Sequence, residues 1–373
     1  MPLRIILTTG GTGGHIFPAL AVAEELKARY PDIQILFVGG HYGAEKELVE
    51  KADIAFVGLP VLGFIGRGLK ALKALSALST SIGQAMNILR SFRPHAVMGF
   101  GGYASFPSLF AAWLLRYPCA LHEQNAIPGS ANKLLGKMAK KICLAWPQPQ
   151  NIASFPSAKT VVTGNPIRKD IAAIGKDTHS NKKECHERCL LIMGGSQGAQ
   201  AINALAVAML PQLVQAGISI IHQTGRAEYE HVVDCYKKHG ISDDVISRSV
   251  FPFIHDMSDT YRRCNLALCR AGATTMAELA AAGIPAVYIP FPYAAHDHQT
   301  ENAKAMQQAG GGLFFPQATA LQMSESGKLA TLLDELIHDD TKLEAMKNGA
   351  LSLAHPDAAA CVADVLLSLI KNK

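Results

Sequence analysis

The stretch NLALCRAGATTMAELAAAGIPAVYIPFPYAAHDHQTEN, residues 265–302, decides the fold of this chain. It predicts a buried strand near Leu266–Leu268, a tight glycine-containing loop, a short helix and a second strand over 286–289. We expect the helix to begin near Thr274–Thr275, whose hydroxyls can cap its first N–H groups, and to end at Gly283. A strand, loop, helix and strand in succession are the repeating unit of an α/β fold with a parallel sheet.

The start of this helix is also a candidate nucleotide site. A glycine loop that feeds a helix N-terminus presents backbone N–H groups and the positive end of the helix dipole, which suit a phosphate. Glu278 lies one turn further along, on the same side as Thr275, where a carboxylate suits the two hydroxyls of a ribose better than a phosphate. The ordinary alternative is that such a glutamate is a solvated helix residue, and other motifs in the chain are needed to distinguish the two interpretations.

Length and composition indicate a soluble protein of two domains. A chain of 373 residues is long for one core, and 49% hydrophobic with 17% charged residues is typical of globular proteins with buried parallel strands. Neither a membrane span nor a signal peptide is expected, because no apolar run is long enough and residues 1–4 lead directly into a strand. The eight scattered cysteines predict reduced thiols in a cytoplasm rather than a zinc site.

Positive charge is concentrated in the first half of the chain. Residues 1–166 hold 16 Lys and Arg against 8 Asp and Glu, whereas the remainder holds 19 against 22. No acidic residue occurs between Asp53 and Glu123, and that interval contains a helical stripe of apolar residues within 61–93. Such a stripe is ordinarily the core-facing side of a helix, but the missing acids favour contact with an anionic lipid surface. One part of the segment can contact lipid while the rest packs on the core.

Glycine loops and polar strand ends mark a second candidate site in the first half. Residues 3–8 predict a strand that runs into TGGTGGH at 9–15 and then a helix, without the spacing of a dinucleotide site or a P-loop. His15, at the helix start, suits a general base or a hydrogen-bond donor, although a structural histidine is equally common. A second glycine turn, at 99–105, follows another predicted strand. The polar run His122–Asn125 lies at the carboxyl end of a further strand, and open α/β sheets bind ligands at such strand ends.

The pattern then restarts, which predicts two similar domains. Residues 175–188 are polar, without apolar periodicity, and indicate a linker or surface loop. The strand and GGSQG loop at 189–198, with the helix that follows, repeat the arrangement at the N-terminus. We expect a first domain of residues 1–166 and a second of 167–356, with an amphipathic helix over about 357–373 that packs back on the first.

Six motifs in this order resemble the MurG family of bacterial transferases, which add N-acetylglucosamine (GlcNAc) to the lipid-linked muramyl-pentapeptide precursor of peptidoglycan. They cover nearly the whole chain: GGTGGH (10–15), GFGGY (99–103), HEQNAIPG (122–129), TGNPIR (163–168), GGSQGA (194–199) and RAGATTMAELAAAGIPA (270–286). The resemblance implies glycosyltransferase-B architecture, in which two Rossmann-like domains face each other across a cleft. The first domain would face the acceptor and the membrane, and the second would bind UDP-GlcNAc.

The resemblance also implies the reaction. An inverting hexosyltransferase would move GlcNAc from UDP-GlcNAc to the 4-hydroxyl of undecaprenyl-diphosphoryl-MurNAc-pentapeptide, converting lipid I to lipid II in peptidoglycan synthesis. The enzyme would thereby serve cell-wall biogenesis, cell shape and cell division. It would be a peripheral protein on the cytoplasmic face of the inner membrane, contacting anionic lipid through 61–93, with cell-wall synthesis and division proteins as candidate partners.

Site residues carried over from the family lie in both halves. Glu278 would bind the ribose and be essential, Arg168 would reach the nucleotide, and the backbone of Ile254 would meet the uracil. The full set implied for UDP-GlcNAc is Thr12, Gly13, Gly14, Asn125, Arg168, Ser196, Ile254, Ala273, Thr274, Thr275, Met276, Ala277, Glu278 and Gln299. The acceptor diphosphate would contact Gly13, Gly14, Gly101, Gly102 and Tyr103.

His15 is the expected catalytic base, and His122 and Glu123 are less favoured candidates. His298 stands where the family often has the first of two adjacent glutamines near the sugar, which puts the details of sugar discrimination in question. No Asp-x-Asp motif accompanies either phosphate loop, so no bound metal or other cofactor is expected. Nucleic acid is not an expected partner.

Three other functions stay open. A UDP-GlcNAc epimerase would share the fold and the donor, but would have no need of a basic, apolar surface over 54–122. A glycosyltransferase acting on diacylglycerol would share the membrane face, but HEQNAIPG argues against it. A non-catalytic nucleotide-sugar-binding scaffold would keep Glu278 and have no use for His15.

Overall fold

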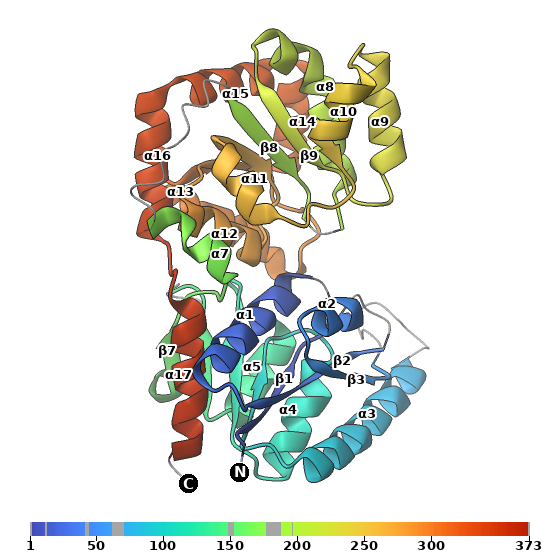
Figure 1. Cartoon of the computed structure of the whole chain (residues 1–373), viewed down its shortest axis with the longest axis vertical. Helices are drawn as coiled ribbons and strands as arrows, with labels where there is room; N and C mark the ends of the chain where they lie inside the picture. The colour runs from blue at the N-terminus through green and yellow to red at the C-terminus, as the bar shows by residue number, and fades with distance from the viewer. Residues whose placement is uncertain are drawn as a thin grey trace. The chain divides into compact units, whose positions relative to one another are not determined.

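The computed structural model describes residues 2–11, 13–41, 45–61, 71–147, 153–176, 188–195 and 197–371. The chain divides into two compact units (Figure 1), the first comprising Met1–Arg168 and His355–Lys373 and the second Lys169–Ala354. Each unit is a parallel sheet flanked by helices, which confirms the predicted α/β class with two Rossmann-like domains.

The first unit has a seven-stranded sheet in the order β3-β2-β1-β4-β5-β6-β7. Its strands are β1 (Arg4–Thr8), β2 (Gln34–Gly40), β3 (Ala55–Leu59), β4 (Ala96–Gly99), β5 (Cys119–Glu123), β6 (Lys141–Leu144) and β7 (Thr160–Val162). Its α-helices are α1 (Gly13–Arg29), α2 (Glu45–Lys51), α3 (Ala71–Phe92), α4 (Ser105–Leu114), α5 (Ser130–Met138) and α17 (Ala358–Lys371).

The apolar strands of the first unit are buried on both faces. Ile5 and Leu7 of β1 belong to a core shared with α1 and α17, whereas Ile6 belongs to a second core shared with α3 and α4. Successive strand residues point to opposite faces, so an uninterrupted apolar strand needs helices on both sides. The C-terminal helix α17 provides part of one cover, with Val362 and Leu366 fully buried.

The second unit has a six-stranded sheet in the order β10-β9-β8-β11-β12-β13. Its strands are β8 (Cys189–Met193), β9 (Ser219–Gln223), β10 (Val250–Phe251), β11 (Leu266–Cys269), β12 (Ala286–Tyr288) and β13 (Gly312–Phe314). Its α-helices are α7 (Lys169–Ala172), α8 (Gln200–Gln215), α9 (Tyr229–Lys238), α10 (Asp243–Ser249), α11 (Met257–Arg263), α12 (Ala273–Ala282), α13 (His298–Gln308), α14 (Gln317–Glu325), α15 (Lys328–His338) and α16 (Asp340–Ser352).

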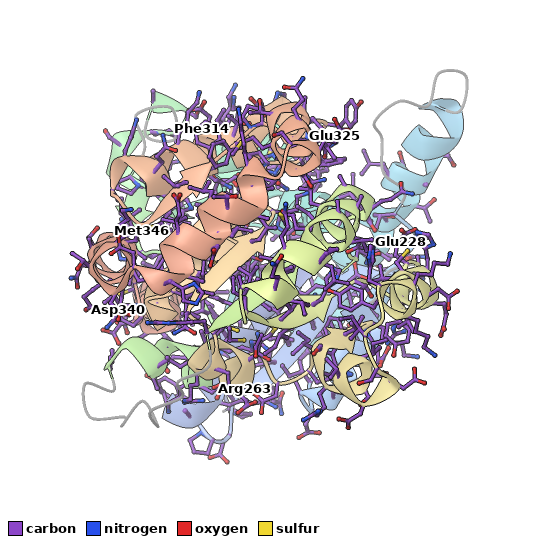
Figure 2. All side chains as sticks on the ribbon, turned by 90° about the horizontal axis from the view of Figure 1, so that it is seen from above. Glu228, Arg263, Phe314, Glu325, Asp340 and Met346 are labelled. Carbon is purple, nitrogen blue, oxygen red and sulfur yellow. The ribbon has the colours of Figure 1, made fainter. Side chains whose placement is uncertain are left out.

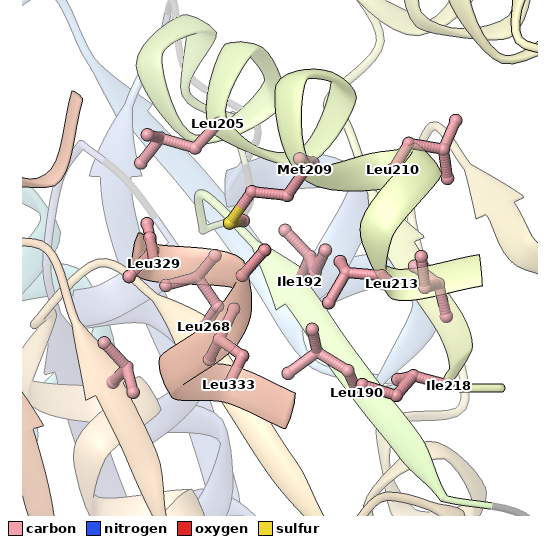
Figure 3. Packing of buried hydrophobic residues seen from close by; sticks show 14 of the residues in the cluster. Leu190, Ile192, Leu205, Met209, Leu210, Leu213, Ile218, Leu268, Leu329 and Leu333 are labelled. Carbon is pink, nitrogen blue, oxygen red and sulfur yellow. The ribbon is translucent and has the colours of Figure 1, made fainter. Parts of the chain in front are cut away.

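Apolar side chains from strands and helices interlock in the second unit. Ile192 and Leu268 of the sheet pack with Met209 of α8 and Leu333 of α15 (Figure 3). All four residues are fully buried. Charged side chains such as Arg263 and Asp340 lie at the exposed outer edge of this unit instead (Figure 2). This separation of apolar and charged residues gives the second unit a core of its own.

Two local predictions need correction. Helix α12 begins at Ala273 behind an N-cap glycine, Gly272, with no side-chain cap, so Thr274 and Thr275 lie inside its first turn. Its end at Gly283, with a φ of 65°, is confirmed. The apolar run FPFI at 251–254 predicts a strand, but in the structure this strand, β10, ends at Phe251, because Pro252 has no N–H to donate to a neighbouring strand.

Other predictions fall partly outside the described residues. The apolar stripe of 61–93 forms α3 over Ala71–Phe92, but residues 62–70 are not described. Thr12, Ser196 and most of the linker predicted at 175–188 also lie outside the described residues. Within the described parts of the chain, no helix has both the length and the apolar character needed to cross a bilayer. The seven cysteines described are free thiols.

Candidate active site

The two glycine loops of the first unit pack directly on each other. Gly102 has a φ of +76°, and a Cβ built on it would lie only 1.8 Å from the Gly10 carbonyl oxygen. Ser105 ties the second loop to strand β1, because its hydroxyl oxygen lies 2.8 Å from the Thr8 carbonyl oxygen and 2.6 Å from that of Gly101, and its single proton is shared between them. The loops therefore form one continuous wall at the carboxyl ends of β1 and β4.

His15 is held in a defined tautomer beside this wall. Its Nδ1 lies 3.1 Å from Oε1 of Gln124, whose Nε2 donates to the Phe100 carbonyl at 2.8 Å. Because that carbonyl only accepts, the amide of Gln124 presents its oxygen to His15, and Nδ1 must carry the proton. Nε2 is thus the basic nitrogen of His15, as a general base at this position requires.

His122 is not placed to act as a base. The side chain is completely buried, and Nε2 donates to the Gly164 carbonyl at 3.0 Å. Burial lowers the pKa of His122 to about 4, so its imidazole stays neutral at physiological pH. Its ring packs 5.7 Å from that of Phe100, which indicates a role in the core of the first unit.

Glu123 organises the loop that follows β5. Its carboxylate is 1% exposed and accepts from the N–H of Asn125 at 2.9 Å, the N–H of Gly129 at 3.2 Å and the amide of Asn132 at 2.7 Å. Burial raises the pKa of Glu123, while these hydrogen bonds lower it. With its lone pairs committed to the loop, Glu123 positions Asn125 and is a poor candidate for the base.

Two residues of the predicted second glycine turn lie close to the first glycine loop and to His15. A Cβ built on Gly101 would lie 3.4 Å from Cε1 of His15 and 3.3 Å from the amide nitrogen of Asn132. The ring of Tyr103 lies 3.8 Å from the Cβ position of Gly11. Burial, and then the negative charge of Glu45, raise the pKa of the Tyr103 phenol, which therefore stays protonated.

A buried carboxylate that the sequence did not reveal sits at the first glycine loop. Glu45, at the start of α2, is fully buried, and its Oε1 accepts from the Gly11 N–H at 2.9 Å. This contact removes one donor that a bound anion would use and adds a negative charge beside Gly11. An acceptor diphosphate would therefore have to rest on Gly13, Gly14 and the second glycine loop.

Arg168, the last residue of the first unit, is anchored on α1. Its guanidinium carbon lies 5.2 Å from the ring centre of Phe17, a cation–π contact. The side chain is half-buried. Phe17 thereby fixes this charge close to the start of α1.

Glu278 is the centre of the second unit's candidate site. It is 6% exposed, and its Oε2 accepts from the hydroxyl of Tyr261 at 2.9 Å. The alternative of a solvated helix residue is therefore wrong. Tyr261, on α11, was not identified from the sequence, since nothing in its local pattern distinguishes it from a core tyrosine.

The start of α12 has the features of an anion site. No side chain caps the helix, so its first-turn N–H groups are not satisfied by a capping residue. Ala273 and Thr274 are buried, Thr275 and Ala277 are half-buried, and the side chain of Met276 lies fully in the core. Met276 can therefore contribute only its backbone.

Arg270 places a buried positive charge just ahead of this helix. It is 7% exposed and donates to the carbonyls of Ile289 and Pro290, both at 3.0 Å, and to the amide oxygen of Gln317 at 2.8 Å. Burial lowers the pKa of Arg270, and these described hydrogen-bond partners are all neutral. A buried cation with neutral partners produces a positive field that favours a bound anion.

The remaining predicted residues lie in the first turn of α13 and on the loop that follows β10 in the second unit. Gln299 is half-buried, and its Oε1 accepts from the Phe291 N–H at 2.9 Å. His298, also half-buried, begins α13. Ile254 is 8% exposed, and its N–H donates to Oε1 of Gln223 at 2.8 Å.

Comparison with known proteins identifies the relatives of the chain. The family description "Glycosyltransferase family 28 N-terminal domain" matches residues 5–144, and "Glycosyltransferase family 28 C-terminal domain" matches 189–362. A protein of Nitratidesulfovibrio vulgaris is 45% identical over 99% of this chain and 98% of its own length. One of Geobacter sulfurreducens is 38% identical over 100% of both. Both are named UDP-N-acetylglucosamine–N-acetylmuramyl-(pentapeptide) pyrophosphoryl-undecaprenol N-acetylglucosamine transferase.

Solved structures agree with this grouping. The crystal structure of Acinetobacter baumannii MurG has a TM-score of 0.76 at 32% identity, covering 98% of this chain and 100% of that one. A UDP-GlcNAc 2-epimerase from Neisseria meningitidis has a TM-score of 0.66 at 15% identity, covering 98% of this chain and 100% of that one. The second likeness shows a shared fold alone.

Proposed function

The chain belongs to glycosyltransferase family 28, and we infer that it transfers GlcNAc from UDP-GlcNAc to the 4-hydroxyl of undecaprenyl-diphosphoryl-MurNAc-pentapeptide, converting lipid I to lipid II. The observation that carries this function is the full-length likeness to transferases of that name. The buried Glu278 and the uncapped α12 supply the matching chemistry for a nucleotide-sugar donor.

We propose that the second unit binds UDP-GlcNAc. The carboxylate of Glu278, oriented by Tyr261, would accept hydrogen bonds from the ribose hydroxyls. The diphosphate would lie at the first turn of α12, where helix N–H groups and the charge of Arg270 favour an anion. Gln299 would contact the sugar, and the loop at Ile254 would contact the uracil.

The proposed chemistry is an inverting displacement. The acceptor 4-hydroxyl oxygen attacks the anomeric carbon of GlcNAc, the bond from that carbon to the UDP oxygen breaks, and a β-linked product forms. The hydroxyl proton passes to Nε2 of His15, the nitrogen left basic by the Gln124 contact. Negative charge that builds on the departing UDP is stabilised by the α12 N-terminus, a fixed dipole that needs no reorganisation.

We assign the acceptor diphosphate to the wall formed by the first unit's glycine loops. Gly13 and Gly14 open α1, and Gly101 and Gly102 lie on the adjoining loop. Tyr103, whose phenol stays protonated, would donate to a phosphate oxygen. Glu45 keeps the anion away from Gly11, which sets the position of the diphosphate along the wall.

A face of the first unit supports peripheral binding to an anionic membrane. Helices α3, α4 and α5 are neighbours, and Trp113, Leu114 and Leu134 on this face are 45%, 51% and 44% exposed. Phe110 links Phe106 and Trp113 into an aromatic row, with ring centres 5.9 and 5.7 Å apart. The exposed cations nearby in sequence are Arg90, Arg93, Arg116, Lys133, Lys137 and Lys140.

Such a face combines apolar insertion with attraction to acidic lipid. The acceptor is itself a membrane lipid, so binding at the cytoplasmic surface would bring the first unit to its substrate. Cell-wall synthesis and division proteins remain candidate partners at that surface.

An epimerase is the competing enzyme, and product analysis separates the two. UDP-GlcNAc is incubated with the protein, first alone and then with lipid I in detergent, and released UDP and sugar nucleotides are resolved by chromatography. A transferase releases UDP in amounts that match lipid II and leaves UDP-GlcNAc unchanged without acceptor. Conversion of UDP-GlcNAc to an epimer without acceptor would contradict the proposal.

A further inference from the structure

Gln223 joins two segments of the second unit through its side-chain amide. It is the last residue of β9, the strand next to the edge strand β10, and pairs in register with Met193 of β8 and Phe251 of β10. Its Nε2 donates to the Gly195 carbonyl at 3.0 Å, and its Oε1 accepts from the Ile254 N–H at 2.8 Å. The amide thus connects the loops that follow both neighbouring strands.

Both contacts fix the amide in one orientation. A carbonyl can only accept and a backbone N–H can only donate, so the amide cannot be turned over without breaking both hydrogen bonds. Gln223 is 4% exposed, and its hydrogen bond to Ile254 is buried, whereas that to Gly195 is partly buried. Removing the side chain would leave the buried Ile254 N–H without this partner, which costs more than the hydrogen bond is worth in water, and would take one hydrogen bond from the Gly195 carbonyl.

The neighbouring backbone has little freedom to compensate. The Gly195 carbonyl also accepts from the Gly198 N–H at 3.0 Å, and a Cβ built on Gly198 would lie 2.1 Å from the Thr224 carbonyl oxygen. The Thr224 N–H in turn donates to the Phe251 carbonyl at 2.9 Å. The glycine turn is therefore packed on the end of β9, and the amide of Gln223 sets the position of Ile254 relative to it.

We propose that Gln223 is a positioning residue for the uracil-nucleotide pocket, because it holds the backbone at Ile254 and the glycine turn at Gly195 in the arrangement that receives the donor. This inference rests on the proposed function, in which the Ile254 loop meets the uracil. Gln223 lies at the carboxyl edge of the sheet, where open α/β folds bind nucleotides. Its role is indirect, acting through the two loops.

The test compares Gln223→Met, which keeps the length and removes both hydrogen bonds, with Gln223→Glu, which keeps only an acceptor for Ile254. Gln307→Met is the matched control, because Gln307 also accepts a backbone N–H, that of Phe314 at 3.1 Å, elsewhere in the same unit. For each full-length variant, the Kd for UDP is measured by calorimetry, together with KM and kcat for UDP-GlcNAc and the melting temperature.

We expect Gln223→Met to raise the Kd for UDP and the KM for UDP-GlcNAc by about tenfold, with kcat at saturating donor nearly unchanged. Gln223→Glu should give a smaller increase, and Gln307→Met none. A lowered melting temperature with Kd and KM as in the wild type would overturn the proposal, since that is what a purely structural residue gives. If Gln223→Met does not fold, unchanged Kd and KM in Gln223→Glu would overturn it equally.

The outcome for the wild type separates this inference from the proposed function. If the wild-type protein does not bind UDP, the proposed function itself is contradicted. If the wild type binds UDP and transfers GlcNAc, and Gln223→Met has the same Kd and KM as the wild type, only the role of Gln223 is contradicted.

Discussion

At the scale of single residues, the candidate site depends on side chains that orient other side chains. Tyr261 holds Glu278, Gln124 holds His15, and Glu123 holds Asn125. The proposed ligand-binding residues were predicted partly from glycine loops and strand-end polar runs, which have recognisable spacing, and partly from the resemblance to the family. Glu123 and Gln124 belong to the predicted polar run, but their supporting contacts were not foreseen, and Tyr261 was not predicted at all, because a tyrosine 17 residues from Glu278 has no local pattern that reveals its contact.

Removing the hydroxyl of Tyr261 should weaken donor binding without removing the carboxylate. We expect Tyr261→Phe to raise KM for UDP-GlcNAc by about fivefold, since one buried hydrogen bond is lost, and to leave kcat nearly unchanged. Tyr117→Phe is the matched control, because Tyr117 loses a comparable bond to the Leu89 carbonyl in the first unit. Steady-state kinetics with varied donor check this, and equal KM values for the two variants would refute the role of Tyr261.

His122 gives a prediction about both catalysis and pH. Burial lowers the pKa of His122 in the folded state to about 4, below the ordinary histidine value of 6.5, so between those pH values the unfolded chain binds a proton that the folded chain does not. Stability should therefore be complete above about pH 6.5 and fall as the pH drops towards 4, by up to about 3 kcal/mol from this residue. His122→Gln, which can still donate to Gly164, should flatten this dependence and keep most of kcat.

Urea unfolding between pH 4 and 7 measures that effect for the wild type and His122→Gln. The same variant assayed for transfer at neutral pH separates His122 from His15. A loss of kcat in His122→Gln as large as that in His15→Gln would mean that His122 takes part in the chemistry.

At the scale of elements, the sequence predicts most strands and helices well and their ends less well. The apolar runs that become β1, β8 and β11 and the C′ glycine of α12 were anticipated. The first turn of α12 was misplaced because Gly272 serves as N-cap where threonines were expected to. Packing of the two glycine loops on each other was not anticipated, since a contact between Gly10 and Gly102 depends on the order of strands in the sheet.

The contact between these loops should tolerate no side chain. Gly102→Ala would bring a Cβ within 1.8 Å of the Gly10 carbonyl, so we expect loss of transfer to the lipid acceptor. UDP binding should persist, because the proposed donor site is in the other unit. Gly83→Ala in α3, where a Cβ meets nothing within 4 Å, is the control. Calorimetry with UDP and a transfer assay test both variants, and full transfer by Gly102→Ala would contradict the loop arrangement.

At the scale of the whole molecule, two units with separate cores match the two proposed substrates. The apolar and basic face of the first unit was predicted in outline from the acid-free interval 54–122. The contributions of Trp113 and Leu134 were not, because they lie on α4 and α5, outside the stripe of 61–93. In the folded unit α4 packs against both α3 and α5, an adjacency that the sequence does not show.

A charge placed on this face should reduce membrane binding. We expect Trp113→Glu to weaken sedimentation with anionic vesicles by about tenfold, since it removes an inserted aromatic and adds repulsion. Val214→Glu, at a residue 47% exposed in the second unit, should have no effect. Transfer to an acceptor in vesicles should fall with Trp113→Glu, while transfer to a short-chain, water-soluble acceptor should not. Equal vesicle binding by the two variants would exclude this face.

The most direct test of the central claim uses labelled UDP-GlcNAc and purified undecaprenyl-diphosphoryl-MurNAc-pentapeptide with wild type, His15→Ala and Glu278→Ala. We predict label in the lipid fraction with the wild type and strong loss with both variants. UDP binding should be retained in His15→Ala and lost in Glu278→Ala, because one residue serves the chemistry and the other the donor. UDP-GlcNAc binding by the wild type with no label in lipid would contradict the transferase assignment, and full transfer by His15→Ala would contradict the assigned base.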